Sequence, residues 1–159
     1  MPTIKPEVLS QITDILYPAN YSGSYGYTSP FERSVLLISE FCFTCNNYFL
    51  NTAYNNQTYA YLFSVPSGLH GQDILYTFYD DGGLSTDYLK MENVTTAIAL
   101  QTMLVSFVQT GTPKAPGGMV FPRYGDNATL FNFNKTDFGL VRDRAANERC
   151  VFWQKGLYN

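Results

Sequence analysis

Apolar residues in the first part of the chain recur every three or four positions, which predicts two amphipathic helices. The first covers residues 6 to 17, because Pro6 suits a first helical turn and Pro18 ends the pattern. Its predicted apolar face consists of Val8, Ile12, Ile15 and Leu16.

The second helix has the clearest start signal in the chain. Ser29 is a suitable N-cap, Pro30 suits the first helical position, and Glu32 is the capping-box partner three residues after the cap. The helical spacing then continues and predicts one buried stripe that includes two cysteines. The stripe consists of Phe31, Val35, Ile38, Cys42, Cys45 and Phe49.

Apolar and aromatic residues fall on both faces of residues 58 to 65, which predicts a largely buried strand. Pro66 and Gly68 end that strand. His70, the one histidine of the chain, therefore lies in a loop at the strand exit. A short helical turn is predicted after it, from Asp73 to Phe78.

The rest of the chain predicts a long helix, two short strands and a last helix. The long helix covers residues 87 to 109 and is closed by Gly111. The strands lie near residues 129 to 133 and 138 to 141, and the last helix carries Cys150. One face of the long helix holds Val94, Ala97, Ile98, Leu104, Val105 and Val108.

Composition narrows the class of protein. The chain has 159 residues, of which 45% are hydrophobic and 14% charged, as in an ordered domain or part of a larger one. The chain has a net charge of -3 and no basic run, so nucleic acid is not an expected partner.

No apolar run approaches the roughly 20 residues of a membrane helix, so we expect no transmembrane segment. The first residues do not resemble a signal peptide.

Glycosylation signals nevertheless point to a secreted glycoprotein. N-x-S/T sequons occur at Asn20, Asn56, Asn93, Asn127 and Asn134. An Asn- and Thr-rich chain also produces such sequons by chance, so the signal is not specific.

Two separate parts of the chain resemble the type-B carboxylesterase/lipase (cholinesterase-like) family. The run YAYLFSVP at 59–66, followed by LHGQDILYTF at 69–78, is similar to the family's catalytic-histidine segment. FTC at 43–45 and CVFW at 150–153 resemble the two halves of its C-terminal disulfide. Three further runs are similar to fungal-type members, namely QTGTP at 109–113, FPRY at 121–124 and LFNF at 130–133.

The resemblance implies that residues 1–159 form a single region of α/β class, the C-terminal portion of an α/β-hydrolase fold. In that family the histidine matching His70 takes a proton from a serine nucleophile and later returns it to the leaving group. Nucleophile and acid precede the histidine along the chain, so both should lie upstream. Asp73 is assigned to the segment that anchors the histidine loop, not to the triad.

The nearest thing to a nucleophile elbow in this chain is SGSYG at 22–26. It lacks the first glycine of the G-x-S-x-G motif and falls in a loop between two predicted helices, so it is interpreted as a turn.

The resemblance also implies a disulfide between Cys45 and Cys150. The bond would close a loop of about 100 residues and stabilise the fold by about 4 kcal/mol in the chain-entropy model. Cys42 would remain a small buried thiol. The alternative is three reduced core cysteines in a cytosolic protein.

The leading hypothesis is the C-terminal segment of a secreted serine carboxylic-ester hydrolase that supplies the triad histidine and is inactive alone. Its substrate in the complete protein would be a carboxylic ester or lipid, and no cofactor or metal is expected. A non-catalytic cholinesterase-like binding or adhesion module, or a remnant, is the alternative. A split hydrolase completed by another chain is a third possibility. Apolar surface around Leu62, Phe63 and the long helix should lack partners and favour association.

Overall fold

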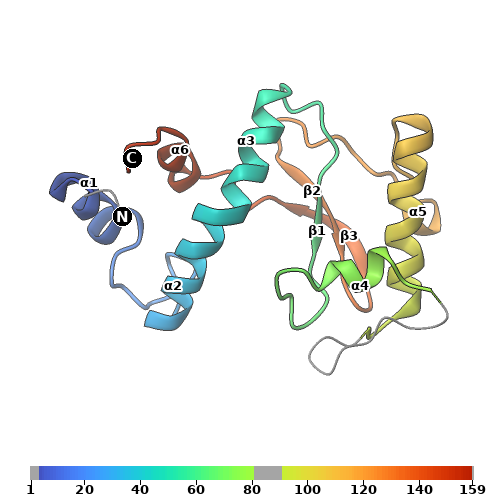
Figure 1. The fold of residues 1–159 in the computed structure, drawn as a ribbon, viewed down its shortest axis with the longest axis horizontal. Helices are drawn as coiled ribbons and strands as arrows, with labels where there is room; N and C mark the ends of the chain where they lie inside the picture. Colours follow the sequence, from blue (N-terminus) through green and yellow to red (C-terminus); the bar gives the residue numbers. More distant parts are fainter. Residues whose placement is uncertain (1–3, 81–90, 159) are drawn as a thin grey trace. The chain divides into compact units, whose positions relative to one another are not determined.

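The computed structural model describes residues 4–80 and 91–158, and within it the chain divides into two compact units. One unit consists of Met1–Asn55 together with Asp143–Asn159, and the other of Asn56–Arg142 (Figure 1). The first unit is built from helices, whereas the second combines a small sheet with helices. The class is therefore mixed α/β. The assignment of residues 1–159 to a single larger domain stays a prediction.

The first predicted helix is present but changes its winding halfway. It begins as α1 (Pro6–Ser10) and continues as the π-helical η1 (Gln11–Leu16). Val8 and Ile12 are buried as predicted. Ile15 is 66% exposed, so the predicted apolar face is wrong at that position. The wider π-helical turn rotates the later residues away from the face that the 3.6-residue period indicates.

The second predicted helix forms a continuous run of α2 (Pro30–Ser39), η2 (Glu40–Thr44) and α3 (Cys45–Ala53). Ser29 is the N-cap, since its Oγ accepts a hydrogen bond of 3.2 Å from the backbone N–H of Glu32. The Glu32 carboxylate does not return to Ser29. It accepts instead from the backbone N–H and the hydroxyl of Thr28, at 2.6 and 2.8 Å.

The predicted buried stripe along this helical run is wrong over most of its length. Phe31 is 77% exposed, Ile38 is 55% exposed and the Cys42 thiol is exposed, whereas Cys45 is fully buried. The π-helical η2 lies between α2 and α3, so a stripe extrapolated with one helical period does not stay on one face. The residues of α2 that pack against the core are instead Leu36 and Leu37.

The predicted disulfide is confirmed, whereas the predicted burial of the third cysteine is wrong. Cys45 and Cys150 form a disulfide across a sequence separation of 105, and both are fully buried. It joins α3 to α6 (Glu148–Gln154), at the core of the helical unit. The prediction that Cys42 is a buried thiol is wrong, because the residue lies on the outer side of η2.

A buried polar cluster lies in the same core and is centred on Glu40, which is 3% exposed. Arg149 donates two hydrogen bonds to its carboxylate, of 2.6 Å from Nε and 2.8 Å from Nη2. Tyr17 adds a hydroxyl donor at 2.6 Å, and Asn147 an amide donor at 3.1 Å. Trp153 Nε1 in turn donates to the Tyr17 hydroxyl. Burial, and after it the hydrogen bond to Glu40, raise the pKa of Tyr17.

Replacing Arg149 by methionine should lower the free energy of unfolding of the helical unit by about 3 kcal/mol. The change leaves the carboxylate of Glu40 buried without its cation, and breaking one side of a buried pair costs about 3–5 kcal/mol. Arg149 keeps 20% of its side chain exposed, which favours the lower end. Urea denaturation measures the loss.

Two further variants test the cause of that loss. The double variant R149M with Glu40→Leu removes both charges and should recover most of the stability. Arg144→Met changes an exposed arginine of the same segment and should stay within about 0.5 kcal/mol of the wild type. A loss for R149M no larger than that for R144M would refute the role given to the cluster.

The second unit contains a three-stranded sheet in the order β1-β2-β3. Its strands are β1 (Tyr61–Phe63), β2 (Thr129–Phe133) and β3 (Phe138–Arg142). β1 and β2 are parallel, and the two strands predicted in the last part of the chain, β2 and β3, form an antiparallel hairpin. β1 is shorter than the predicted 58–65, although Ala60 and Ser64 on either side of it still hydrogen-bond to β2, through Phe131 N–H at 3.0 Å and the Phe133 carbonyl at 2.8 Å. Leu62 is exposed on this strand.

Among the residues that the structure describes between β1 and β2, two α-helices complete the core of this unit. α4 (Asp73–Thr77) matches the predicted short turn, and α5 (Val94–Thr110) is the long helix. α5 starts later than predicted, because the Asn93 side chain caps it by accepting from the Thr95 N–H at 2.8 Å. The predicted helical residues 87–90 lie outside the described residues. Gly111 ends α5 in the left-handed conformation, as expected.

α5 is apolar around most of its circumference. One side packs against the sheet in a core of Val65, Leu75, Tyr76, Ala97, Ala99, Leu100, Met103, Phe121, Phe131 and Phe133. On the other side Ile98, Val105 and Val108 are exposed, Val108 by 84%. The expectation of unpartnered apolar surface on this helix and at Leu62 is therefore confirmed, whereas Phe63 is half-buried. Within the described part of the chain, no helix has both the length and the apolarity to cross a membrane.

Candidate active site

His70 is exposed in the loop that joins β1 to α4, at the carboxyl end of a strand that pairs in parallel with its neighbour. Two successive turns form this loop. In the first the Gly68 N–H donates to the Val65 carbonyl at 2.7 Å, and in the second the Gln72 N–H donates to the Leu69 carbonyl at 3.0 Å. His70 is thus held on a tight double turn directly after the strand.

Glycines on both sides of the histidine make this path possible. Gly68 has a φ of 70° and Gly71 a φ of 82°, a region that side chains with a Cβ rarely adopt. The loop can therefore reverse direction twice within four residues and leave the His70 side chain on the outside.

Gln72 is the buried polar residue beneath the loop, with 3% of its surface exposed. Its Oε1 accepts from the backbone N–H groups of Gly68 at 2.9 Å and Leu69 at 3.2 Å. Its Nε2 donates to the Pro66 carbonyl at 3.0 Å. Each polar atom of the carboxamide is thus engaged with the backbone on the N-terminal side of His70.

The next residue, Asp73, begins α4 and faces β1. The Tyr61 hydroxyl donates to its Oδ2 at 3.5 Å, and burial, followed by the charge of Asp73, raises the pKa of Tyr61. At the far end of α4, the Gln101 side chain donates to the carbonyls of Thr77 and Tyr79, at 3.2 and 2.8 Å. The helix that follows His70 is therefore attached to β1 at one end and to α5 at the other.

The elbow-like run at 22–26 is a loop between η1 and α2, as its sequence predicted. Ser22 and Ser24 are exposed, and their hydroxyl oxygens lie 2.9 Å apart in a hydrogen bond with each other. A nucleophile elbow requires a strand before the serine and a helix after it. Because the element that leads into this loop is the π-helical η1 and not a strand, the loop does not have the structure of an elbow.

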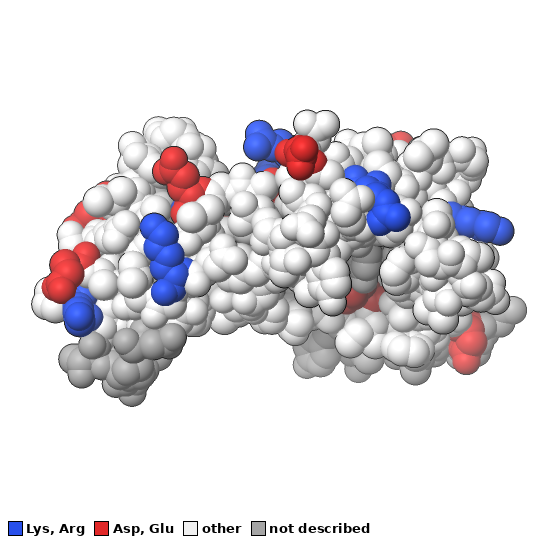
Figure 2. Space-filling view, turned by 90° about the horizontal axis from the view of Figure 1, so that it is seen from above, with Lys and Arg blue, Asp and Glu red and all other residues white. Residues whose placement is uncertain are grey.

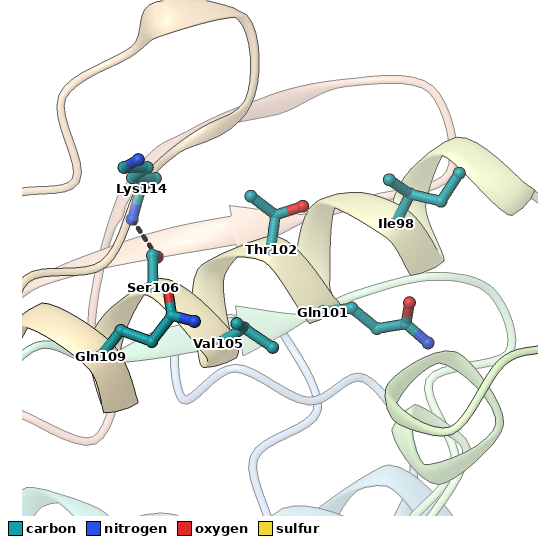
Figure 3. Close-up of a pocket in the computed structure, with 7 residues that line it drawn as sticks. All are labelled: Ile98, Gln101, Thr102, Val105, Ser106, Gln109 and Lys114. Carbon is teal, nitrogen blue, oxygen red and sulfur yellow. Dashed lines mark hydrogen bonds between the residues drawn. The ribbon is translucent and has the colours of Figure 1, made fainter.

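Within residues 4–80 and 91–158, no group of three or more His, Cys, Asp or Glu side chains gathers in a way that could hold a metal ion. A shallow groove follows the outer face of α5 (Figure 3), lined by Ile98, Gln101, Thr102, Val105, Ser106, Gln109 and Lys114. In it the Lys114 N–H donates to the Ser106 hydroxyl. Almost all of the lining comes from one helix, so the groove lacks convergent polar groups from several elements.

The five sequon asparagines differ in their exposure. Asn20 and Asn127 are exposed, whereas Asn56, Asn93 and Asn134 are half-buried. Asn93 Nδ2 donates to the Lys135 carbonyl at 2.6 Å, and Asn56 Nδ2 to Asp126 at 3.5 Å. Glycosylation at these residues stays a prediction, for which Asn20 and Asn127 are the best presented.

Charge on the surface is sparse. On the face shown in Figure 2, Lys and Arg occur in small groups interspersed with Asp and Glu, and uncharged residues cover most of the area. The described residues on that face therefore show no basic patch of the kind that binds nucleic acid.

His70 is an exposed imidazole on a turn directly after a parallel strand. A histidine in such a position can exchange protons with a molecule that binds beside it.

No protein-family model matches the chain. Comparison with curated proteins shows that the chain is homologous to part of two fungal carboxylesterases. It is 31% identical over 148 residues to Carboxylesterase patB of Penicillium expansum and 35% identical over 149 residues to Carboxylesterase patB of Aspergillus clavatus. Each match covers 93% of this chain, which spans 26% of the relative's length.

The sequence placed His70 correctly after a strand, but it did not indicate the buried polar contacts of Gln72 in one unit and of Glu40 in the other. Nothing in the hydrophobic pattern indicates that Gln72 turns inward beneath its own loop. The pairing of Glu40 with Arg149 spans 109 positions and leaves no local signal. The helical spacing of Glu40 beside Leu36 and Leu37 was the one available hint that this carboxylate faces the core.

Proposed function

We propose that this chain is the C-terminal segment of a secreted serine carboxylic-ester hydrolase with an α/β-hydrolase fold, and that His70 is its triad histidine. The observation that carries the proposal is the homology to carboxylesterases along 93% of the chain. The chain spans about a quarter of those relatives, at 26% of their length, so the nucleophile and the acid are assigned to the remainder of the protein.

The position of His70 supports this role. In α/β-hydrolases the triad residues lie on loops at the carboxyl ends of the strands. His70 lies in such a loop after β1, with its side chain exposed. An imidazole there can accept the proton of a serine hydroxyl as that oxygen attacks the ester carbonyl. It then returns the proton to the alkoxide that leaves, and the acyl group remains on the serine.

Water completes the cycle with the same group. His70 takes a proton from water as that water attacks the acyl-enzyme, and then gives the proton to the departing serine oxygen. The carboxylic acid is released and the imidazole returns to its starting state. A carboxylate from the upstream part would fix the imidazole's orientation and stabilise it while it is protonated.

Exposed apolar faces support the proposal that this segment packs against further polypeptide. α5 is apolar both toward the sheet and away from it, which is typical of a helix covered on two sides. α2 exposes Phe31, Val35 and Ile38 in the same way. Apolar surface of this kind marks interaction sites or liabilities to association in a soluble protein.

The disulfide supports the proposed compartment. Cys45–Cys150 is a structural disulfide in a buried core, and such bonds persist mainly in oxidising compartments. The exposed sequons at Asn20 and Asn127 agree with passage through the secretory pathway. Together they favour secretion over a cytosolic location.

The test begins with the 5′ end of the native transcript, from which the complete reading frame is expressed and secreted. The product should hydrolyse p-nitrophenyl butyrate and be labelled covalently by a fluorophosphonate at a serine upstream of His70. A frame without such a serine, or a product that binds esters without hydrolysing them, would contradict the proposal. The non-catalytic binding module would then be the better description.

A further inference from the structure

The loop that carries His70 is built from two successive turns on either side of Leu69. Gly68 and Gly71 give the backbone wide conformational freedom on either side of the histidine, because each adopts a positive φ without a Cβ. Leu69 and His70 are both exposed and so contribute little apolar packing. A general base on such a loop needs a fixed backbone, since small displacements from the reactive geometry cost much of the rate.

Gln72 provides the fixed point. It lies two residues after His70. Its carboxamide oxygen accepts hydrogen bonds from the N–H groups of Gly68 and Leu69, and its carboxamide nitrogen donates to the Pro66 carbonyl. The three hydrogen bonds span Pro66 to Leu69, which is the part of the loop that precedes the histidine. With 3% of the residue exposed, water competes poorly for these bonds.

We propose that Gln72 is a positioning residue for His70, which clamps the loop from Pro66 to Leu69 in the conformation that presents the imidazole. The role rests on the proposed catalytic use of His70. The clamp itself is a property of this chain and can be measured without any hydrolysis.

The chemistry of the carboxamide explains why glutamine suits this position. The clamp needs one oxygen that accepts two N–H groups and one nitrogen that donates to a carbonyl, at the end of two methylene groups. Asparagine offers the same groups but is one methylene shorter. Glutamate has the right length, but its ionised carboxylate cannot donate to the Pro66 carbonyl. Alanine supplies none of the three bonds.

The first experiment compares the wild-type chain with Gln72→Ala by NMR. Because His70 is the one histidine, a single imidazole Cε1–Hε1 signal reports on its surroundings. In Q72A that signal should move toward its position in the denatured chain, and the protection of the Leu69 amide from hydrogen exchange should fall at least tenfold. Leu69 is a sharper probe than Gly68, whose N–H also donates to the Val65 carbonyl.

Gln109→Ala is the matched control, since it removes an exposed glutamine from α5 in the same unit. It should leave both signals unchanged. Amides of the β2–β3 hairpin should stay protected in both variants, which separates local loosening of the loop from unfolding of the unit. Wild-type protection of Leu69 and an unshifted His70 signal in Q72A would overturn the proposal.

Gln72→Glu is a second variant that tests the same hydrogen bonds if Q72A unfolds. The protonated carboxyl group can donate to Pro66 and accept from the loop, whereas the ionised form can only accept and faces the carbonyl oxygen. Leu69 protection, relative to the hairpin, should therefore be close to wild type below the carboxyl pKa and fall as pH rises through it. A relative protection that does not change with pH would overturn the proposal as well.

Hydrolysis by the complete protein then separates the clamp from the proposed function. Q72A should lower kcat for p-nitrophenyl butyrate at least tenfold and change KM little, because the group lost orients the base and does not bind substrate. If the NMR signals change as expected but the wild-type protein hydrolyses no ester, the clamp stands and the proposed function fails. If the wild type is active and Q72A keeps full kcat, Gln72 does not position His70.

Discussion

Replacing His70 by alanine should reduce ester hydrolysis by the complete protein at least about a thousandfold, because the serine would lose the base that accepts its proton. The loss should appear in kcat and kcat/KM alike, since the imidazole acts in the transition state and contributes little to ground-state binding. His70 is exposed, so H70A should keep the thermal stability of the wild type. Initial rates with p-nitrophenyl butyrate and a melting curve measure both effects.

Ser24→Ala is the control for that prediction. Ser24 belongs to the one run of this chain that resembles a nucleophile motif, but it lies in an exposed loop and shares a hydrogen bond with Ser22. S24A should retain full activity. Equal losses in H70A and S24A would show that activity depends on something other than the proposed triad, and full activity in H70A would exclude His70 as the base.

Removing the disulfide with a Cys45→Ala and Cys150→Ala double change should destabilise the helical unit by about 4–5 kcal/mol. The estimate comes from the chain entropy released by opening a loop whose ends are 105 residues apart. Since typical domains are stable by about 5–15 kcal/mol, the unit should be close to unfolding at room temperature. Trp153, the one tryptophan of the chain, lies in this unit and reports its unfolding by fluorescence.

Cys42→Ala provides the comparison for the double variant. Its thiol is exposed and outside the disulfide, so the free energy of unfolding should change by no more than about 0.5 kcal/mol. Treating the wild-type chain with a reductant should reproduce the effect of the double variant. A double variant as stable as C42A would show that the entropy of this loop contributes little.

Helix positions were predicted well from the sequence where a capping residue marks the start or the end of the helix. Ser29 and Gly111 mark helix ends in the structure as they do in the sequence. The two strands of the hairpin were also predicted at the right places, near residues 129 to 133 and 138 to 141. Burial was harder, because the stripe through Phe31 and Ile38 assumed one helical period across residues that wind as a π-helix.

The candidate site was predictable only in part. The position of His70 follows from the strand signal before it and the glycines beside it. The support beneath it does not, because the fixing group is a side chain that bonds to backbone groups rather than to a recognisable partner residue. Interactions of that kind depend on the three-dimensional path of the loop, which no periodicity of polar and apolar residues encodes.

The discontinuous helical unit also has a consequence for the order of folding during synthesis. Residues 56–142 leave the ribosome before the segment that carries Arg149 and Cys150, so the sheet unit can form while the helical unit still lacks its last part. Until that segment emerges, Glu40 has no cation and Cys45 no partner. A premature stop after residue 142 would therefore leave the unit of residues 56–142 complete. The helices of residues 1–55 would keep their apolar core surface exposed, and chaperones and quality-control proteases would recognise the truncated protein.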